Sequence, residues 1–336
     1  MAEDFRTAPR SARKRHRICG ARCACSATLA AHATGEFTLT LLQAILLGVV
    51  EGITEYLPVS STGHLILLSR ALGLAETEAD RSAIDQFNIV VQGAAVLAVL
   101  GLYRVDVLRM LRAIVAWIGG VGRLPLLSME ADLRLARNLL LSFLPAAVIG
   151  KLLDERIEQL LFGSMPVMCA LAVGGAAMLL IAPTVRRRAA EPASEADARP
   201  TGASLSALAA VAIGFVQCIA MVPGTSRSMV TIVAALACGM HPREAARYSF
   251  LLALPTLGGA CVYKGSKMLS GGGSIELLGG WVPVGVGLVA AFISAVLSVR
   301  WLVGFLGRGG FALFGWWRIA LAVLVGIALL QGWIPR

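Results

Sequence analysis

The chain has 336 residues, of which 57% are hydrophobic and only 15% are charged, and its formal net charge is +10. A mean hydropathy of +0.77 excludes an ordinary soluble domain, in which about half of the residues are apolar and about a quarter are charged. Apolar runs long enough to span a bilayer recur along the chain. They predict an all-α, polytopic integral membrane protein.

Residues 1–35 differ in kind from the rest. They hold seven of the 30 Lys and Arg residues against two acidic residues, which is +5 of the net +10, and they show no apolar periodicity. The short stretch 27–33 is too interrupted to be the apolar core of a signal peptide. We expect a disordered basic extension, or a start codon placed too far upstream, ahead of a single membrane domain at 36–336.

Ten helical segments are predicted between residues 38 and 334. Five lie in a first half, 38–182, and five in a second half, 204–334, with a polar linker at 185–203 between the halves. Because five is odd, the second half enters the membrane from the opposite side, which predicts an inverted-topology repeat. The predicted segments are 38–57, 63–74, 84–103, 137–153, 162–182, 204–222, 226–240, 246–263, 279–299 and 311–334.

Each half opens with an apolar run that proline and small polar residues interrupt. The interruptions are Pro58-Val-Ser-Ser-Thr-Gly63, within 38–74, and Pro223-Gly-Thr-Ser226, within 204–240. Non-helical backbone at membrane depth is tolerated only where protein or a polar cavity satisfies it. The two runs are therefore expected to be re-entrant helix–turn–helix pairs, with six full transmembrane helices beside them.

The basic residues of the loops predict an orientation. In this topology the loops 104–137, 186–203, 241–247 and 300–310 share one face and carry 14 Lys and Arg, against seven on the other face. The positive-inside rule then places these four loops in the cytoplasm and both termini outside. The seven basic residues of the extension would make the two faces equal.

Glu51 and Glu55 are four residues apart, so both project from one face of the same helix. Two carboxylates in an apolar wall repel each other unless a cation or a shared proton relieves them. A hard divalent ion such as Mg²⁺ or Ca²⁺ would suit them, and so would proton exchange in a transporter. A pair of glutamates at a helix end is the purely structural alternative.

Pro223-Gly-Thr-Ser-Arg-Ser228 is a hydroxyl-rich turn that opens a new helix. Backbone N–H groups at a helix N-terminus bind anions, and the guanidinium of Arg227 can grip two phosphate oxygens. Ser226, Ser228 and Thr231 would add hydroxyl donors. An ion pair of Arg227 with Glu51 or Glu55 is the structural alternative.

Ser60-Ser61-Thr62-Gly63-His64 forms the corresponding turn of the first half. His64 beside serines and carboxylates favours acid–base work, although a lone histidine is often a structural hydrogen-bonder. Together the two turns indicate phosphoryl chemistry on a lipid phosphate. The alternative is a transporter or flippase of lipid phosphates, since broken helices in an inverted repeat are typical of transporters.

The two motifs, Glu51 to His64 and Pro223 to Thr231, resemble the signature motifs of the undecaprenyl-diphosphate phosphatases of the bacitracin-resistance type. The resemblance covers about residues 38–334 and includes the softer stretches 87–92 and 248–255. It implies hydrolysis of undecaprenyl diphosphate to undecaprenyl phosphate and inorganic phosphate, which recycles the lipid carrier of peptidoglycan synthesis and confers resistance to bacitracin. It also implies a multi-pass protein of the bacterial inner membrane whose site faces the periplasm or the cell exterior.

The resemblance further implies roles for named residues. Glu51 and Glu55 would bind a divalent cation, Mg²⁺ or Ca²⁺, or orient the attacking group. Ser61 would be the nucleophile, with water as the open alternative, and His64 would transfer a proton. Arg227 would hold the diphosphate and stabilise the transition state. The expected substrate-binding residues are Ser60, Thr62, Gly224, Ser226, Ser228 and Thr231.

The remaining predictions concern the binding partners of the protein and the residues near the start of its last helix. We expect a polyprenyl lipid substrate and membrane lipid as partners, no nucleic acid, and self-association as an open possibility. Trp316, Trp317 and Arg318, near the start of the last helix, read most simply as an interfacial anchor. A role of Arg318 near the substrate is the alternative.

Overall fold

The structure is a computed structural model that describes residues 39–74, 77–119, 126–161, 163–191, 201–270, 278 and 280–334. Within these residues every regular element is a helix, which confirms the all-α prediction. The basic extension 1–35 and residues 192–200 of the predicted linker lie outside the described residues.

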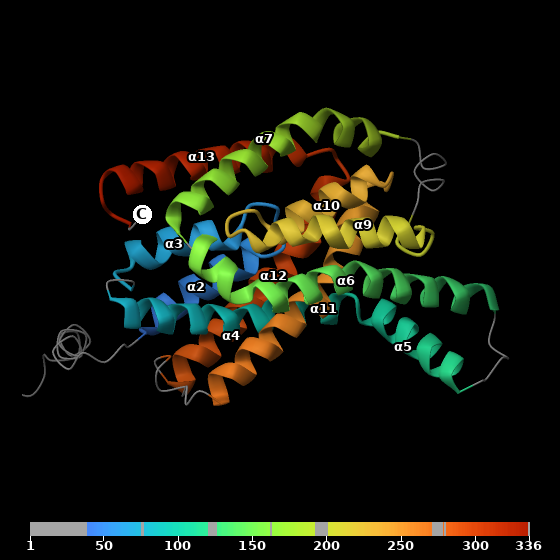
Figure 1. The fold of residues 1–336 in the computed structure, drawn as a ribbon, viewed down its shortest axis with the longest axis horizontal. Helices are drawn as coiled ribbons and strands as arrows, with labels where there is room; N and C mark the ends of the chain where they lie inside the picture. Colours follow the sequence, from blue (N-terminus) through green and yellow to red (C-terminus); the bar gives the residue numbers. More distant parts are fainter. Residues whose placement is uncertain are drawn as a thin grey trace, which may run out of the picture.

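Within the part of the chain that the structure describes, six helices are long and apolar enough to cross a membrane, in agreement with the six predicted crossings. In Figure 1 the shorter helices lie between long ones, and α7 and α13 run side by side along one edge of the molecule. The six are α4 (Glu78–Leu102), α6 (Leu126–Leu161), α7 (Ser164–Ala189), α11 (Pro242–Ser270), α12 (Trp281–Leu306) and α13 (Phe311–Leu330).

Two pairs of shorter helices occupy the places of the predicted re-entrant runs. The first pair is α2 (Leu41–Thr54) and α3 (Ser61–Ala71). The second is α9 (Ala207–Gln217), continued by the 3₁₀ turn η1 (Cys218–Met221), and α10 (Arg227–Ala237). None of these helices is long enough to span a bilayer alone. That the pairs dip into the membrane and return, and that the halves are inverted, stay predictions.

The two pairs share an unusual backbone conformation. Ser60 is the N-cap of α3 with a φ of 72°, and Ser226 is the N-cap of α10 with a φ of 70°. Left-handed backbone is costly for a residue with a side chain and persists only where its surroundings enforce it. The same strain at the equivalent serine of each turn supports the interpretation of the two motifs as structural copies.

Helix α2 is held against α12 by a stripe of small residues. A Cβ atom on Gly52 would lie 2.1 Å from Ser294 Oγ, so no larger residue fits at this contact. Ser298 Oγ donates to the carbonyl oxygen of Gly52 at 3.0 Å. Small residues let membrane helices approach closely and hydrogen-bond across the contact. This contact fixes the position of the helix that carries Glu51 and Glu55.

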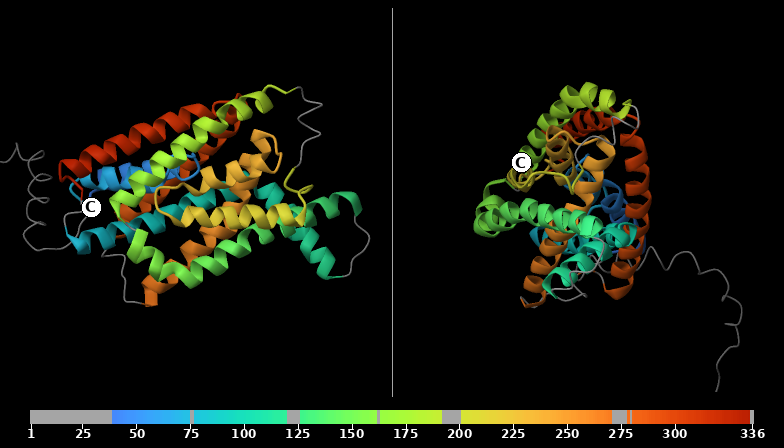
Figure 2. Two further views of the ribbon diagram at one scale, coloured as in Figure 1. Left: turned by 45° about the horizontal axis from the view of Figure 1, so that its top comes forward. Right: turned by 90° about the vertical axis from the view of Figure 1, so that its right-hand side faces the viewer.

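One predicted loop is a helix. Residues 104–137 were expected to connect two crossings, but α5 spans Arg104–Ile118 and projects from the bundle in the left view of Figure 2. Its three arginines break the apolar run, so hydropathy alone does not reveal it. An ion pair at 2.7 Å between Asp106 of α5 and Arg247 of α11 ties this helix to the bundle.

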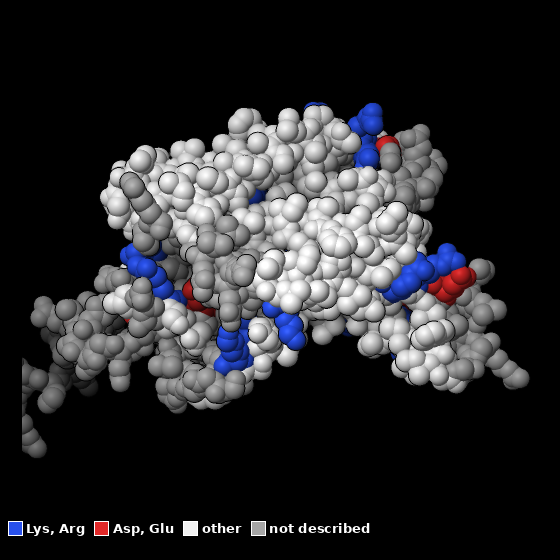
Figure 3. All heavy atoms as spheres, viewed as in Figure 1, with Lys and Arg blue, Asp and Glu red and all other residues white. Residues whose placement is uncertain are grey.

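Several predicted boundaries also move outward. The polar linker was placed at 185–203, but α7 continues to Ala189, with Arg186, Arg187 and Arg188 in its last turn. Basic side chains are favourable at a helix C-terminus, where they complement the partial negative charge of the free carbonyl groups. Likewise, α12 continues to Leu306 through the predicted loop 300–310. The visible face in Figure 3 is largely uncharged, with Lys and Arg near its margins, as a membrane protein requires.

Candidate functional site

The carboxylate of Glu55 links the two predicted motifs. Glu55 closes α2, and its Oε2 accepts a hydrogen bond from Ser61 Oγ at 2.9 Å. Its Oε1 lies 3.6 Å from Nη2 of Arg227, an ion pair too long for a hydrogen bond. The side chains of Glu55 and Arg227 are only 6% and 9% exposed. A buried acid, a hydroxyl and a cation from both halves of the chain therefore meet at one place.

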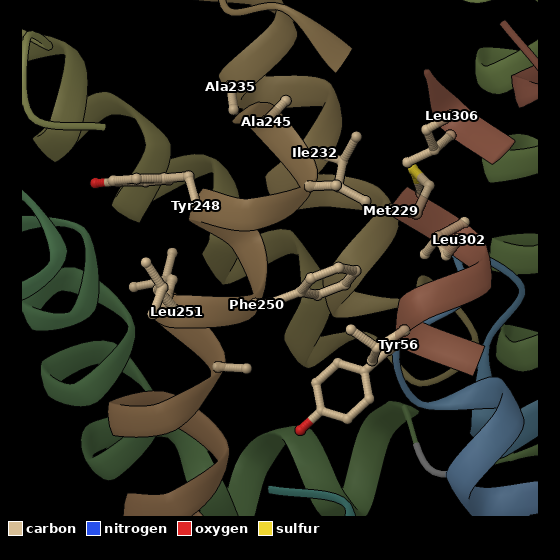
Figure 4. Packing of buried hydrophobic residues seen from close by; sticks show 14 of the residues in the cluster. Tyr56, Met229, Ile232, Ala235, Ala245, Tyr248, Phe250, Leu251, Leu302 and Leu306 are labelled. Atoms are coloured by element: carbon tan, nitrogen blue, oxygen red, sulfur yellow. The ribbon is translucent and has the colours of Figure 1, made fainter. Parts of the chain in front are cut away.

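The guanidinium of Arg227 is oriented by α11 and by an aromatic ring. Its Nη1 donates to the carbonyl oxygen of Ser249 at 3.0 Å. Its central carbon lies 5.7 Å from the centre of the Tyr56 ring, within the range of a cation–π interaction. Tyr56 in turn packs edge-on against Phe250 with ring centres 5.6 Å apart, as Figure 4 shows. The remaining nitrogens, Nε and Nη2, make no hydrogen bond within the described residues.

Three predicted hydroxyls support the turn and Arg227. Ser226 Oγ accepts the N–H of Met229 at 3.3 Å and so caps α10. Ser228 is fully buried and donates to the carbonyl oxygen of Leu57, which ties the second motif to the first. Thr231 is also fully buried and bonds to Ser249 Oγ at 2.6 Å. Ser228 and Thr231 therefore have protein partners in the positions where we expected substrate contacts.

The first turn has a similar division. Ser60 is buried and occupies the N-cap position of α3, without a side-chain bond to that helix. Thr62 is half-buried at the start of α3. In the second turn, Gly224 presents its carbonyl oxygen to Arg318 at 2.9 Å. The substrate-binding roles of these three residues stay predictions.

Glu51 fits a role in holding a cation. It lies one turn before Glu55, is 2% exposed, and its Oε2 is buried without a hydrogen bond among the described residues. A buried carboxylate oxygen of this kind needs a proton or a cation. Mg²⁺ is commonly held by one or two carboxylates together with substrate phosphates. The donor set thus suits a divalent ion shared between the protein and a diphosphate.

His64 points to a different group. Its Nδ1 lies 2.7 Å from the carbonyl oxygen of Ser60, and its Nε2 accepts a hydrogen bond from Trp317 Nε1 at 2.8 Å. The two rings also stack, 6.0 Å between centres. Nδ1 therefore carries the proton and the imidazole is neutral. We expected His64 beside serines and carboxylates; it contacts the backbone of Ser60, but none of the described contacts joins it to Ser61 or Glu55.

The structure also reveals site residues that the motifs did not include. Gln92 of α4 donates to Glu55 Oε2 at 3.2 Å and shares that oxygen with Ser61. Ser249 of α11 contacts both Arg227 and Thr231. Both lie within the softer stretches 87–92 and 248–255. A polar side chain inside a predicted membrane span was the available signal for Gln92.

Arg318 contradicts the anchor interpretation. Trp316 and Trp317 are 64% and 53% exposed, as expected at an interface, but Arg318 is completely buried. On a helix, successive residues are about 100° apart, so the third residue of this run faces the protein interior. The alternative expectation, a position near the substrate site, agrees with its contact to Gly224.

The fold and this cluster define a multi-pass membrane protein with a buried guanidinium, two carboxylates and a serine at the junction of two matching turns. Comparison with known proteins gives the family. The chain matches the family described as bacitracin resistance protein BacA over residues 44–324. Since the match covers most of the chain, the chain belongs to this family, and the expected resemblance is confirmed.

Individual relatives agree with this assignment. A protein of Cereibacter sphaeroides named undecaprenyl-diphosphatase is 40% identical over 300 residues, 87% of this chain and 98% of the relative. A protein of Sorangium cellulosum with the same name is 44% identical over 283 residues, 84% of each chain. One from Pseudomonas putida, also so named, is 39% identical over 296 residues, 88% of this chain and 96% of the relative.

Proposed function

We propose that this protein is an undecaprenyl-diphosphate phosphatase, which hydrolyses undecaprenyl diphosphate to undecaprenyl phosphate and inorganic phosphate. The observation that carries the proposal is the contact of Glu55 with both Ser61 and Arg227. It joins a nucleophile, a base and an anion-binding cation in an apolar setting. The names of the relatives support the substrate. They do not favour the alternative of a lipid-phosphate transporter.

The first chemical step follows from the contact of Ser61 with Glu55. Ser61 Oγ already donates its proton to Glu55 Oε2, so Glu55 is positioned as the general base. As that proton moves to Glu55, Oγ bonds to the terminal phosphorus and the bridging P–O bond breaks. Undecaprenyl phosphate leaves with the electron pair of that bond. Water then cleaves the phosphoserine and releases inorganic phosphate. Direct attack by water, with Glu55 again as base, is the alternative.

Arg227 stabilises the charge of this transition state. Its Nε and Nη2 donors are free of hydrogen bonds to described residues, whereas Nη1 is held by Ser249. Two phosphate oxygens can therefore be held by the planar fork without displacing the bond that orients it. The N-terminus of α10, which begins at Arg227, adds backbone donors and the positive end of its dipole.

Glu51 and Glu55 would hold a divalent cation, Mg²⁺ or Ca²⁺, beside the diphosphate. When bound, such an ion neutralises phosphate charge and polarises the phosphoryl group. The unpartnered Oε2 of Glu51 supports this assignment. Glu55 is shared with Ser61, Gln92 and Arg227, so Glu51 is the better placed of the two ligands.

His64 would transfer a proton to the leaving phosphate. Its ring is neutral, and Nε2 accepts a hydrogen bond from Trp317. To transfer a proton, Nε2 must lose this bond and take a proton from water or the substrate instead. Trp317 thus holds the histidine in one tautomer and orientation between turnovers. This refines the predicted acid–base role and gives it a readout, since Trp317→Phe would remove the bond while keeping the ring.

The setting of the reaction is part of the proposal. The protein would lie in the bacterial inner membrane, with the site facing the periplasm or cell exterior, as the family resemblance implies. The count of basic residues in the loops is compatible with this orientation. Regeneration of the lipid carrier there supports peptidoglycan synthesis. Removal of the diphosphate form would lower the amount of lipid that bacitracin can sequester, and so confer resistance.

Phosphate release from undecaprenyl diphosphate by the purified, detergent-solubilised protein tests the proposal. The assay compares wild type, Glu55→Gln and Arg227→Ala, each with and without a divalent metal. Metal-dependent release that both substitutions abolish would support the hydrolase and its two-motif site. A wild type that binds the lipid but releases no phosphate with any metal would contradict the proposal and restore the transporter alternative.

A further inference from the structure

Arg318 of α13 is a buried cation without an acidic partner. It is 0% exposed, and it is the largest of the fully buried side chains among the described residues. Its Nη2 donates to the carbonyl oxygens of Gly224 at 2.9 Å and of Ala170 at 3.0 Å. Its Nε and Nη1 make no hydrogen bond within the described residues, and no described carboxylate forms an ion pair with it.

Neighbouring helix α7 is shaped around this guanidinium. A Cβ atom on Gly174 would lie 2.3 Å from Nη2 of Arg318 and 2.9 Å from its central carbon. Any side chain at position 174 would therefore push the guanidinium away from the carbonyl oxygens that it bonds. Glycine at this point of α7 leaves the space that Arg318 occupies.

Such a residue is a poor contributor to stability. Removing a charge from water costs several kcal/mol, and neutral carbonyl groups return only part of that cost. Replacing a buried charge by an apolar residue of similar volume is often neutral or stabilising. The positive charge of Arg318 is therefore better explained by what it does to the site than by what it adds to folding.

Its contact lies at the turn that precedes Arg227. The peptide group between Gly224 and Thr225 is held at both ends: Arg318 bonds its oxygen, and its N–H donates to the carbonyl oxygen of Val222 at 3.1 Å. Because a peptide group is planar, these two bonds fix its orientation. The chain then enters Ser226, whose strained φ of 70° requires surroundings that enforce it.

We infer that Arg318 is a positioning residue that acts through the carbonyl oxygen of Gly224. It holds the turn 222–226 so that the N-terminus of α10 and the fork of Arg227 face the diphosphate. Its fixed positive charge behind the turn also favours an anion there. The inference rests on the proposed function, of which it specifies the phosphate-binding part.

Two measurements on Arg318→Met separate positioning from a structural role. We expect kcat/KM for undecaprenyl diphosphate to fall by about 10²-fold, the usual cost of losing one oriented donor group. The melting temperature in detergent should be unchanged or higher, because an unpaired buried charge has been removed. Arg308→Met, at an exposed position in the turn between α12 and α13, is the control and should alter neither quantity.

Conservative and neighbouring variants sharpen the test. Arg318→Lys should recover part of the activity, because an ammonium group can donate to the Gly224 carbonyl oxygen but lacks the planar fork. Gly174→Ala should reduce activity in the wild-type background and have little further effect in Arg318→Met, since both changes act on the same contact. Additive losses in that pair would overturn the inference.

A ligand-induced shift in melting temperature tests the same point without turnover. Inorganic diphosphate should raise the melting temperature of the wild type and raise that of Arg318→Met much less. Wild-type kinetics in Arg318→Met, or a loss of activity that follows a lowered melting temperature, would overturn the inference. A wild type that releases no phosphate would count against the proposed function, and the diphosphate shift would then still decide the role of Arg318.

Discussion

The two turns share a backbone conformation but carry side chains of opposite charge. Ser60 and Ser226 take almost the same strained φ, and each begins a helix of 11 residues. The first turn brings oxygen groups to the site, the carboxylate of Glu55 and the hydroxyl of Ser61. The second brings the cation of Arg227. The same backbone conformation thus occurs twice, and under the proposed function the side chains of the two turns would contribute different groups to one reaction.

The same division is visible one turn earlier. Glu51 in α2 and Gln217 in α9 occupy matching places in the two motifs, and both are almost fully buried. Gln217 donates from Nε2 to the carbonyl oxygen of Ser142 at 3.4 Å, and its Oε1, like Oε2 of Glu51, has no hydrogen bond within the described residues. The neutral amide suits a structural contact. The buried carboxylate of Glu51 needs a proton or a cation, so under the proposed function the metal would bind in the first half.

Loss of the nucleophile from the first turn should have the largest effect. Ser61→Ala removes the hydroxyl that donates to Glu55, and we expect turnover to fall by more than about 10³-fold if Ser61 forms the covalent intermediate. Phosphate release by the purified variant measures this. Mass spectrometry of rapidly quenched wild-type enzyme should also detect phosphate on the peptide that contains Ser61.

The same experiment distinguishes attack by Ser61 from direct attack by water. Ser82→Ala is a suitable control, because this serine is exposed near the start of α4, where it accepts a hydrogen bond from Gln86. If Ser61→Ala retains more than about a tenth of wild-type turnover and no phosphopeptide forms, the covalent route is wrong and Glu55 must activate water instead.

The next largest effect is expected when the shape of the Arg227 side chain changes but its charge does not. Arg227→Lys keeps the positive charge but loses the planar fork that spans Ser249, Glu55 and the ligand. We expect kcat/KM to fall by about 10²–10³-fold. Near-normal kcat/KM in this variant would show that a point charge suffices and would remove Arg227 from the bidentate role.

Exchanging acid and amide at the matched positions 51 and 217 should change a different property in each half. Glu51→Gln should abolish the response of turnover to divalent metal while leaving the melting temperature unchanged or raised, because a buried carboxylate is removed. Gln217→Glu should lower the free energy of unfolding by about 1–3 kcal/mol, since a carboxylate would then face the carbonyl oxygen of Ser142. Equal behaviour of the two variants in both measurements would refute the proposed division.

The smallest effect is expected at the helix contact that supports the first turn. Ser298→Ala removes the hydrogen bond to the carbonyl oxygen of Gly52 and should reduce stability by about 0.6–1 kcal/mol, with little change in kcat. Thermal unfolding in detergent, alongside phosphate release, measures both. A large loss of kcat without loss of stability would mean that α12 takes part in the site more directly than its packing indicates.

Sequence patterns predicted the long helices because each is a continuous apolar run of sufficient length. The same criterion missed α5, whose arginines at 104, 109 and 112 interrupt its apolar face. It also ended α7 and α12 too early, since α7 closes with three arginines and Arg300 interrupts the apolar run of α12. Hydropathy measures what a membrane accepts, whereas helices continue past the membrane boundary wherever backbone hydrogen bonds allow.

The site residues that lie within the two motifs could be predicted, whereas those that come from distant parts of the chain could not. Glu55, Ser61 and Arg227 belong to compact motifs, and the structure brings these three together as expected. Gln92 reaches Glu55 from 37 residues away, and Arg318 reaches Gly224 from 94 residues away. Such partners depend on how helices pack, which one sequence does not state. The predicted neighbours of His64 failed for the same reason, because Trp317 of α13 holds its ring.

The central claim is that one site is assembled from both halves through Glu55 and Arg227. A double-mutant cycle with Glu55→Asp and Arg227→Lys, read as kcat/KM for undecaprenyl diphosphate, tests it most directly, because these mild changes leave measurable activity. The account predicts strong coupling, about 0.5–3 kcal/mol, with the double variant losing much less than the sum of the single losses. Additive losses would contradict it and would mean that the two residues act independently.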